Sequence, residues 1–196
     1  MTTVRRTTGI LGALIAALAT TAGAQQTERA VFFVRLGHDT LAAEIVSLTD
    51  GRAEGDLRYR TPLTRVQRTF RLSPAFEVQS LDHTKGSGAR GEVGATHTVI
   101  NVHGDSADIS IDRTPQTTPS STRRFALPRG TVPFDNLSGL TLELVLRRAR
   151  AIGGDTVMVP LLIAPGQVVP ARVTRAGTDS AVISVSGIDI RARTDA

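Results

Sequence analysis

One segment of this chain, residues 136–154, has the sequence of a helix, whereas the segments around it have the sequence of strands and turns. Asn136 or Ser138 is a suitable N-cap, and Gly153-Gly154 suits a C-terminal stop. A strand is the alternative, because four leucines alternate with other residues: Leu140, Leu142, Leu144 and Leu146. We favour the helix, since the tail Arg-Arg-Ala-Arg-Ala is a poor strand former. On a helical wheel the apolar residues cover more than half of the circumference, which predicts a mostly buried helix.

The rest of the sequence, from residue 25 onward, is dominated by short alternating segments separated by turn residues. This spacing of about ten residues is typical of antiparallel sheets and barrels. We therefore predict a mainly β (α+β) fold, a curved antiparallel sheet or half-barrel of about 9–10 strands. The helix, at about residues 136–152, is expected to pack on the concave face of this sheet. The expected strands are 30–36, 41–49, 57–60, 66–72, 75–84, 98–102, 107–112, 156–163, 167–175, 180–186 and 188–193, and residues 50–56 are expected to form a polar turn.

Residues 113–130 are rich in Thr, Pro and Ser and show no apolar alternation. Loops of this length are uncommon in compact domains and are either functional or disordered. We predict a flexible crossover here. Because it precedes the predicted helix, it is a natural place for a lid.

The first 24 residues have the pattern of a secretory signal peptide. Arg5 and Arg6 form a positive start, residues 10–19 form a short apolar run, and Ala22-Gly23-Ala24 is an A-x-A cleavage site. A membrane anchor is the alternative, but the run is well short of the ~20 residues that span a bilayer. We expect export to the periplasm or the extracellular space, with residues 25–196 as a single β-rich domain and no transmembrane segment in the mature chain.

The composition argues against several classes of function. The formal charge is +5, but basic and acidic residues are interleaved, Trp is absent and Tyr59 is the only tyrosine. Binding of nucleic acid is therefore not expected, because it requires a basic stripe and, for single strands, stacking aromatics. Lys85 is the only lysine, and the sequence has no cysteine, which rules out a disulfide or a lipid anchor on cysteine.

Two short motifs resemble those of enzymes. Residues 86–91 match G-x-G-x-x-G, but a strand rather than a helix is expected to follow, so no helix dipole would hold a pyrophosphate. Gly104-Asp105-Ser106 resembles the nucleophile motif of lipase-like hydrolases, yet no histidine follows His103. We interpret both motifs as turns or loops.

The histidines and one inward-facing acid were considered as metal or catalytic sites. His97 and His103 share a face of a regular strand, and His83 could lie near Asp108, but zinc needs three or four converging ligands. We therefore predict neither a metal nor a cofactor. Glu44 lies among apolar residues, where an arginine partner, Arg58, Arg60 or Arg68, would satisfy it as a structural ion pair. No catalytic residue is predicted, and the protein is expected not to be an enzyme.

Two resemblances follow from the order of elements and from local sequence. The sequence of signal peptide, β-meander, crossover, helix and further strands resembles the periplasmic half-barrel of lipoprotein-carrier (Lol-type) proteins. In that fold a curved sheet and a covering helix enclose an apolar cavity. The segments 33–44 and 133–193 are similar to uncharacterised exported proteins of GC-rich bacteria. In some exported proteins such a module precedes an α/β-hydrolase domain, which is not found in this sequence.

These patterns lead to a functional expectation. We predict an exported, non-enzymatic β-domain that binds an apolar or amphipathic, lipid-like ligand between sheet and helix. The alternative is an interaction or accessory module for an envelope protein or a secreted hydrolase. The residues expected to line the cavity are Phe33, Phe70, Phe76, Leu140, Leu144, Val159 and Leu161.

Overall fold

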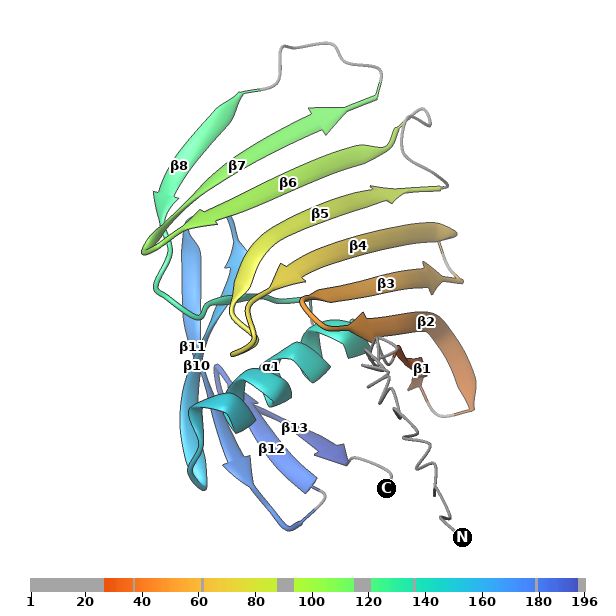
Figure 1. Cartoon of the computed structure of the whole chain (residues 1–196). Helices are drawn as coiled ribbons and strands as arrows, with labels where there is room; N and C mark the ends of the chain where they lie inside the picture. Colours follow the sequence, from red (N-terminus) through yellow and green to blue (C-terminus); the bar gives the residue numbers. More distant parts are fainter. Residues whose placement is uncertain are drawn as a thin grey trace, which may run out of the picture.

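The computed structural model describes residues 27–36, 38–60, 62–87, 94–114, 121–135, 137–178 and 180–193. These residues form thirteen strands and one helix, arranged as an eight-stranded and a five-stranded sheet (Figure 1). The prediction of a mainly β fold is confirmed. The predicted signal peptide, residues 1–24, lies outside the described residues.

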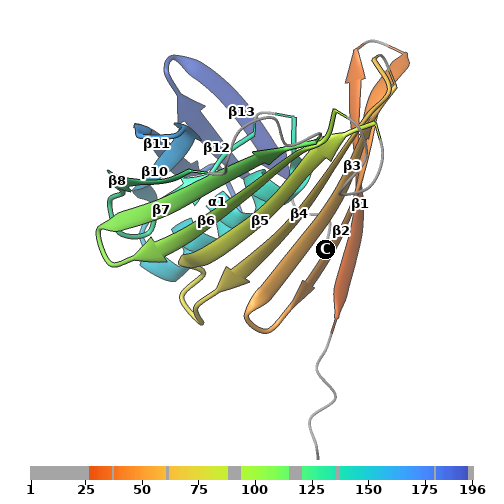
Figure 2. The same cartoon turned by 90° about the horizontal axis from the view of Figure 1, so that it is seen from above.

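The first sheet is a meander in which each strand pairs antiparallel with the next. Its edges are β1 and β8 (Figure 2). The strands are β1 (Glu28–Leu36), β2 (Asp39–Thr49), β3 (Arg52–Tyr59), β4 (Thr64–Leu72), β5 (Val78–Gly86), β6 (Thr96–His103), β7 (Ser106–Arg113) and β8 (Thr122–Ala126).

The predicted polar turn over residues 50–56 is wrong for residues 52–56, because β3 begins at Arg52. Gly51, with φ of +73°, closes a tight turn between β2 and β3. The acids of β3 lie on the outer face, where Arg65 pairs with Asp56 at 2.8 Å, while Ala53 and Leu57 are fully buried. Residues 52–56 were therefore not predicted as strand, because most residues of β3 are polar and only its small and apolar residues are buried.

The predicted crossover over residues 113–130 is also wrong for residues 122–126, which form β8. This edge strand pairs with β7, and Arg124 Nε lies 2.7 Å from Asp108 Oδ1 on the neighbouring strand. Phe125 packs against the core from the other face. An edge strand with one inward aromatic shows no apolar alternation, so sequence periodicity could not reveal it. Residues 115–120 of the predicted crossover lie outside the described residues.

The second sheet has the order β13-β12-β11-β10-β9, with β9 and β10 parallel and the other pairs antiparallel. The prediction of one sheet of 9–10 strands is therefore wrong. The chain passes through the helix before β10, and the helix occupies the space between the two sheets (Figures 1 and 2). The strands are β9 (Val132–Pro133), β10 (Thr156–Ala164), β11 (Gln167–Arg175), β12 (Ser180–Val185) and β13 (Ile188–Arg193).

The predicted helix is confirmed as α1 (Gly139–Ile152). The Ser138 hydroxyl, as N-cap, accepts a hydrogen bond from the amide of Thr141, and Gly153, with φ of 82°, ends the helix. The helix contacts β2 and β3 of the first sheet and β9 and β10 of the second. It therefore joins the two sheets. Within the described residues, no helix is both long and apolar enough to cross a membrane.

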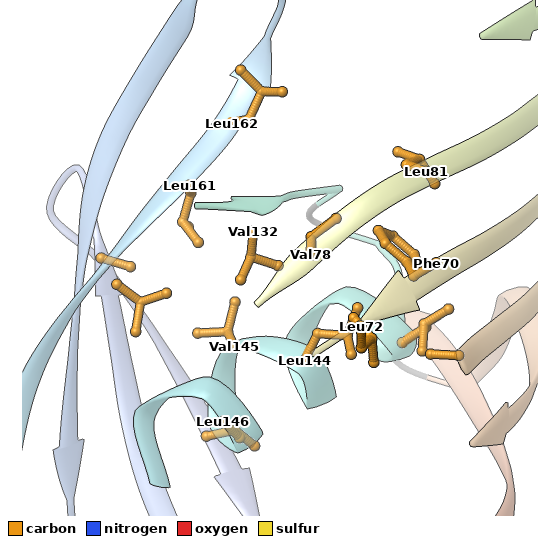
Figure 3. Close-up of a cluster of buried hydrophobic side chains, with 14 of the residues drawn as sticks. Phe70, Leu72, Val78, Leu81, Val132, Leu144, Val145, Leu146, Leu161 and Leu162 are labelled. Carbon is orange, nitrogen blue, oxygen red and sulfur yellow. The ribbon is translucent and has the colours of Figure 1, made fainter. Parts of the chain in front are cut away.

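A continuous apolar core surrounds the helix (Figure 3). Leu144 and Val145 have no solvent exposure. In Figure 3 they lie between side chains of the first sheet, such as Leu72, and those of β10, such as Leu161. Because both sheets bury one face against the same helix, their relative position depends on the packing of α1.

Candidate functional site

A cleft of about 600 Å³ lies between the first sheet and the start of the helix. This volume lies within the ~300–1,000 Å³ typical of small-molecule sites. One wall is the inner face of the first sheet, which we define as the face toward α1. The other wall comprises Pro133, Phe134, Asp135, Thr141 and residues 162–165.

Strand register explains which side chains form the sheet wall. Paired residues of antiparallel strands project from the same face. Two adjacent rows across β4 to β7 therefore line the cleft. The apolar row is Phe70, Leu81, Ile100 and Ile109, and the mixed row is Arg68, His83, Thr98 and Ile111.

A buried ion pair closes the cleft at the helix N-terminus. The Arg68 guanidinium lies 3.3 Å from Glu44 Oε1, and both side chains are less than 5% exposed. Arg68 also pairs with Asp135, which precedes the helix. The prediction that Glu44 has an arginine partner is thus confirmed, with Arg68 as the partner.

Hydrogen bonds tie this ion pair to the first turn of α1. The Ser138 hydroxyl donates to Glu44 Oε1 at 2.9 Å, and the amide of Leu140 donates to Glu44 Oε2 at 3.1 Å. A carboxylate at this position is favoured by the positive end of the helix dipole. The Thr141 hydroxyl donates to the carbonyl of Asp135 at 2.8 Å. The polar end of the cleft is therefore a fixed network, with each charge held by a partner.

His83 is the titratable group beside this network. Burial, followed by the positive charge of Arg68, lowers the pKa of His83 to about 4. The imidazole is therefore neutral at physiological pH. Its Nε2 atom is buried without a hydrogen-bond partner in the described structure. The mixed row thus holds a neutral imidazole next to the Arg68 guanidinium, whose charge is paired with Glu44 and Asp135.

The seven residues predicted to line a cavity occupy different places. Phe70 lines the cleft. Four others belong to the packed core with no solvent exposure: Leu140, Leu144, Val159 and Leu161. Phe76 packs at the margin of the core, with the Arg147 guanidinium 5.5 Å from its ring centre. Phe33 lies on β1 and is 57% exposed.

The Gly104-Asp105-Ser106 motif lies in the β6–β7 hairpin, and the glycine-rich motif begins at Gly86, the last residue of β5. Ser106 faces His103 across the β6–β7 hairpin, and its hydroxyl donates to the His103 carbonyl at 3.1 Å. The interpretation of Gly104-Asp105-Ser106 as a turn is confirmed. Most of the glycine-rich motif, residues 88–91, lies outside the described residues.

Two of the histidines considered as ligands lie beside acids. His97 Nε2 lies 3.0 Å from Asp82 Oδ1 and its Nδ1 lies 3.9 Å from Asp112 Oδ2, while His103 Nε2 lies 3.4 Å from Asp108 Oδ2. Asp108 is not beside His83, because the strand partner of His83 on β6 is Thr98. Among the described residues, no group of three or more acids and histidines is arranged to hold a metal ion.

Sequence reasoning did not bring Arg68, His83 and Asp135 together as parts of a cleft. Arg68 has a local signal, since it stands between the inward-facing Val66 and Phe70. His83 reaches the site through the pairing of β5 with its neighbours. Asp135 reaches it because the chain comes back to the first sheet just before α1. Neither relationship leaves a signal in the local sequence.

The comparisons with known proteins address the fold. No family model and no curated protein matches the sequence. The crystal structure of a DUF1089 family protein from Pseudomonas aeruginosa is similar, with a TM-score of 0.56 at 16% identity. The match covers 84% of this chain and 91% of that chain. At this identity the similarity shows that the two proteins share a fold and carries no information on function.

Proposed function

We propose that this protein binds an apolar or amphipathic, lipid-like ligand in the cleft between the first sheet and α1, without catalysing a reaction. The observation that carries the proposal is the cleft itself, about 600 Å³ in volume, with the row from Phe70 to Ile109 on one wall and Phe134 and Leu162 on the other. Apolar walls with a few placed polar groups are typical of sites for organic ligands.

The arrangement of polar groups favours binding over catalysis. Glu44, Arg68 and Asp135 are bound to one another and to the start of the helix. A general base or nucleophile needs a free position next to the substrate. In the described part of the cleft, these charged groups hold the structure together instead.

The cellular setting is part of the same proposal. We infer that residues 1–24 direct export and that the first sheet acts as a Lol-type half-barrel, with α1 as its covering element. The order of the strands and the position of the helix between two sheets support this reading. Mass spectrometry of the protein from a bacterial periplasmic fraction would test it: cleavage after Ala24 is expected, and an intact N-terminus would contradict export by this signal.

Ligand binding can be tested with a substitution that fills the cleft. Thr98 lies in the mixed row at the cleft wall, on a strand where tryptophan is well tolerated. Native mass spectrometry of the protein expressed in bacteria should show a co-purified lipid-like mass, which Thr98→Trp removes. Thr69→Trp, on the outer face of β4, is the matched control. A wild-type protein that neither carries nor takes up an amphiphile would refute the proposal.

A second function is favoured by an exposed apolar patch on the β1–β2 hairpin. Val31, Phe33 and Ile45 are 54%, 57% and 56% exposed, and Val31 and Ile45 are paired across the two strands. Exposed apolar patches of this kind mark interaction sites. The patch supports the alternative of an interaction module for another envelope protein.

Site-specific photo-crosslinking in cells separates this alternative from ligand binding. A photoreactive residue at Phe33 should give a discrete protein adduct, whereas one at Leu36, which is even more exposed but lies outside the patch, should not. The absence of an adduct at Phe33 would leave the patch without a partner protein.

A further inference from the structure

Three cations border the cleft on the inner face of the first sheet. Lys85 follows His83 by two residues, Arg113 follows Ile111 by two residues, and Arg123 is the strand partner of Ile109. Lys85 and Arg113 are both partners of Thr96, so they lie on the same face in one row. All three residues are exposed.

Within the described part of the chain these cations have no counterions, although neighbouring arginines have them. On the outer face of the same sheet, Arg65 pairs with Asp56 and Arg124 pairs with Asp108. Among the described residues, no ion pair is formed by Lys85, Arg113 or Arg123. Their charges are therefore available to a ligand at the mouth of the cleft.

The charge balance of the cleft favours an anion at this end. Arg68 neutralises one of the two carboxylates beneath it, Glu44 and Asp135. The three cations at the mouth exceed the remaining negative charge. The effect of Lys85 reaches the cleft wall, because its charge contributes to the low pKa of His83.

We propose that the cleft selects a single-chain amphiphile with an anionic head, a carboxylate or a phosphate. The head lies at the row of Lys85 and Arg113, and the apolar tail lies toward Ile109, Ile100 and Leu81. Arg123, at the β8 end of the apolar row, adds positive charge to the same wall. This inference rests on the proposed ligand-binding function and adds the charge of the ligand and its direction in the cleft. The row of Lys85 and Arg113 is separated from the apolar row by the mixed row, and this separation of a cationic end from an apolar end matches such a molecule.

Isothermal titration of the purified protein with matched twelve-carbon probes tests the inference. The probes are dodecanoate, dodecyl phosphate and dodecyltrimethylammonium below their micelle concentrations, together with inorganic phosphate. The two anionic amphiphiles should bind at least about tenfold more tightly than the cationic one, and their relative affinity separates carboxylate from phosphate as the preferred head. Inorganic phosphate should not bind, because it has no tail. Affinity for the anions should fall as salt rises, since the cations are exposed.

Charge-neutralising variants assign the effect to these residues. The triple variant Lys85→Gln, Arg113→Gln, Arg123→Gln should bind dodecanoate about tenfold or more weakly than the wild type. Each exposed charge is expected to contribute a few-fold to the affinity, and the three contributions multiply. Its control is Arg71→Gln, Arg150→Gln, Arg172→Gln, which removes the same charge from exposed arginines outside the cleft and should bind as the wild type does. If the triple variant does not fold, Lys85→Gln alone should still weaken binding a few-fold.

The outcomes separate this inference from the proposed function. Equal binding of all three amphiphiles, abolished by Thr98→Trp, would overturn the anionic preference and keep the cleft as a ligand site. Unchanged affinity of the triple variant for dodecanoate would also overturn the role of the three cations and keep the cleft as a ligand site. Binding of inorganic phosphate as tight as that of dodecyl phosphate would overturn the role of the tail. Failure of every amphiphile to bind the wild type would overturn both the inference and the proposed function.

Discussion

The carboxylate of Glu44 on β2 accepts hydrogen bonds from the hydroxyl of Ser138, the N-cap of α1, at 2.9 and 3.1 Å, although 94 residues separate the two in sequence. The same hydroxyl accepts the hydrogen bond that caps the helix. One buried serine therefore fixes the start of the helix and binds it to the first sheet. The position of α1, and with it one wall of the cleft, depends on this contact.

Removing the Glu44 side chain should destabilise the protein strongly. Glu44→Ala leaves Arg68 buried with Asp135 as its remaining partner and leaves the amide of Leu140 unpaired, so we expect a loss of about 3–5 kcal/mol. Urea denaturation followed by circular dichroism measures this loss. Glu54→Ala is the control, because Glu54 forms an exposed pair with Arg52 that is worth about 0–1 kcal/mol. Equal losses in the two variants would show that the buried network does not hold the helix.

A methyl group at Gly139 should also be destabilising, against the usual helix preference. Alanine in a helix is normally favoured over glycine by about 1 kcal/mol. Here a Cβ atom at Gly139 would lie 2.6 Å from the Cβ and Cδ1 atoms of Phe32, so one of the two must move. We expect Gly139→Ala to cost about 1–3 kcal/mol. Combining it with Phe32→Ala should recover part of that loss in a double-mutant cycle, and purely additive effects would exclude this contact as the cause.

Local periodicity predicted the elements that bury a regular set of side chains. β2, β4 and α1 belong to this group, and so does the pairing of Glu44, because an acid among apolar neighbours needs a cation. β8 escaped prediction, since only Phe125 of its five residues packs inward. The division into two sheets escaped as well. Alternation marks the buried face of a strand, but it does not say which sheet the strand joins.

The sequence led us to expect an apolar hollow beside the helix, and Phe70 is the one residue named for it that lines the cleft. Apolar excess identified Leu144 and Leu161 correctly as buried residues, yet it could not distinguish a packed core from the wall of a cleft. Arg68 and Asp135 are 67 residues apart and meet only after the chain has returned through β8 and β9. The anionic preference proposed above depends on register across β5 to β8, which is a property of the sheet and not of any one strand.

The contribution of the helix to the core can be measured at two aliphatic positions that differ in burial. Leu144 has no solvent exposure, whereas Ile152 is 46% exposed. Leu144→Ala should cost about 2–5 kcal/mol because it leaves a cavity between the two sheets. Ile152→Ala should cost about 1 kcal/mol or less, since most of its surface is already in water. Denaturant midpoints of the two variants check the difference, and similar values would contradict the placement of α1 in the core.

The buried histidine predicts a dependence of stability on pH. The pKa of His83 is about 4 in the folded protein and about 6.5 when unfolded, so between these values the unfolded state binds more protons. Stability should therefore fall as pH is lowered from about 6.5 to 4, by up to about 3 kcal/mol, and this contribution should level off below pH 4. His83→Phe removes the titrating group and should flatten the dependence in urea denaturation at pH 7.5 and 5. Thr98→Val, at the strand position opposite His83, has no titrating side chain and should keep the wild-type slope. A His83→Phe variant that keeps the full slope would assign the pH dependence to other groups and remove the evidence for a neutral, buried imidazole at the cleft wall.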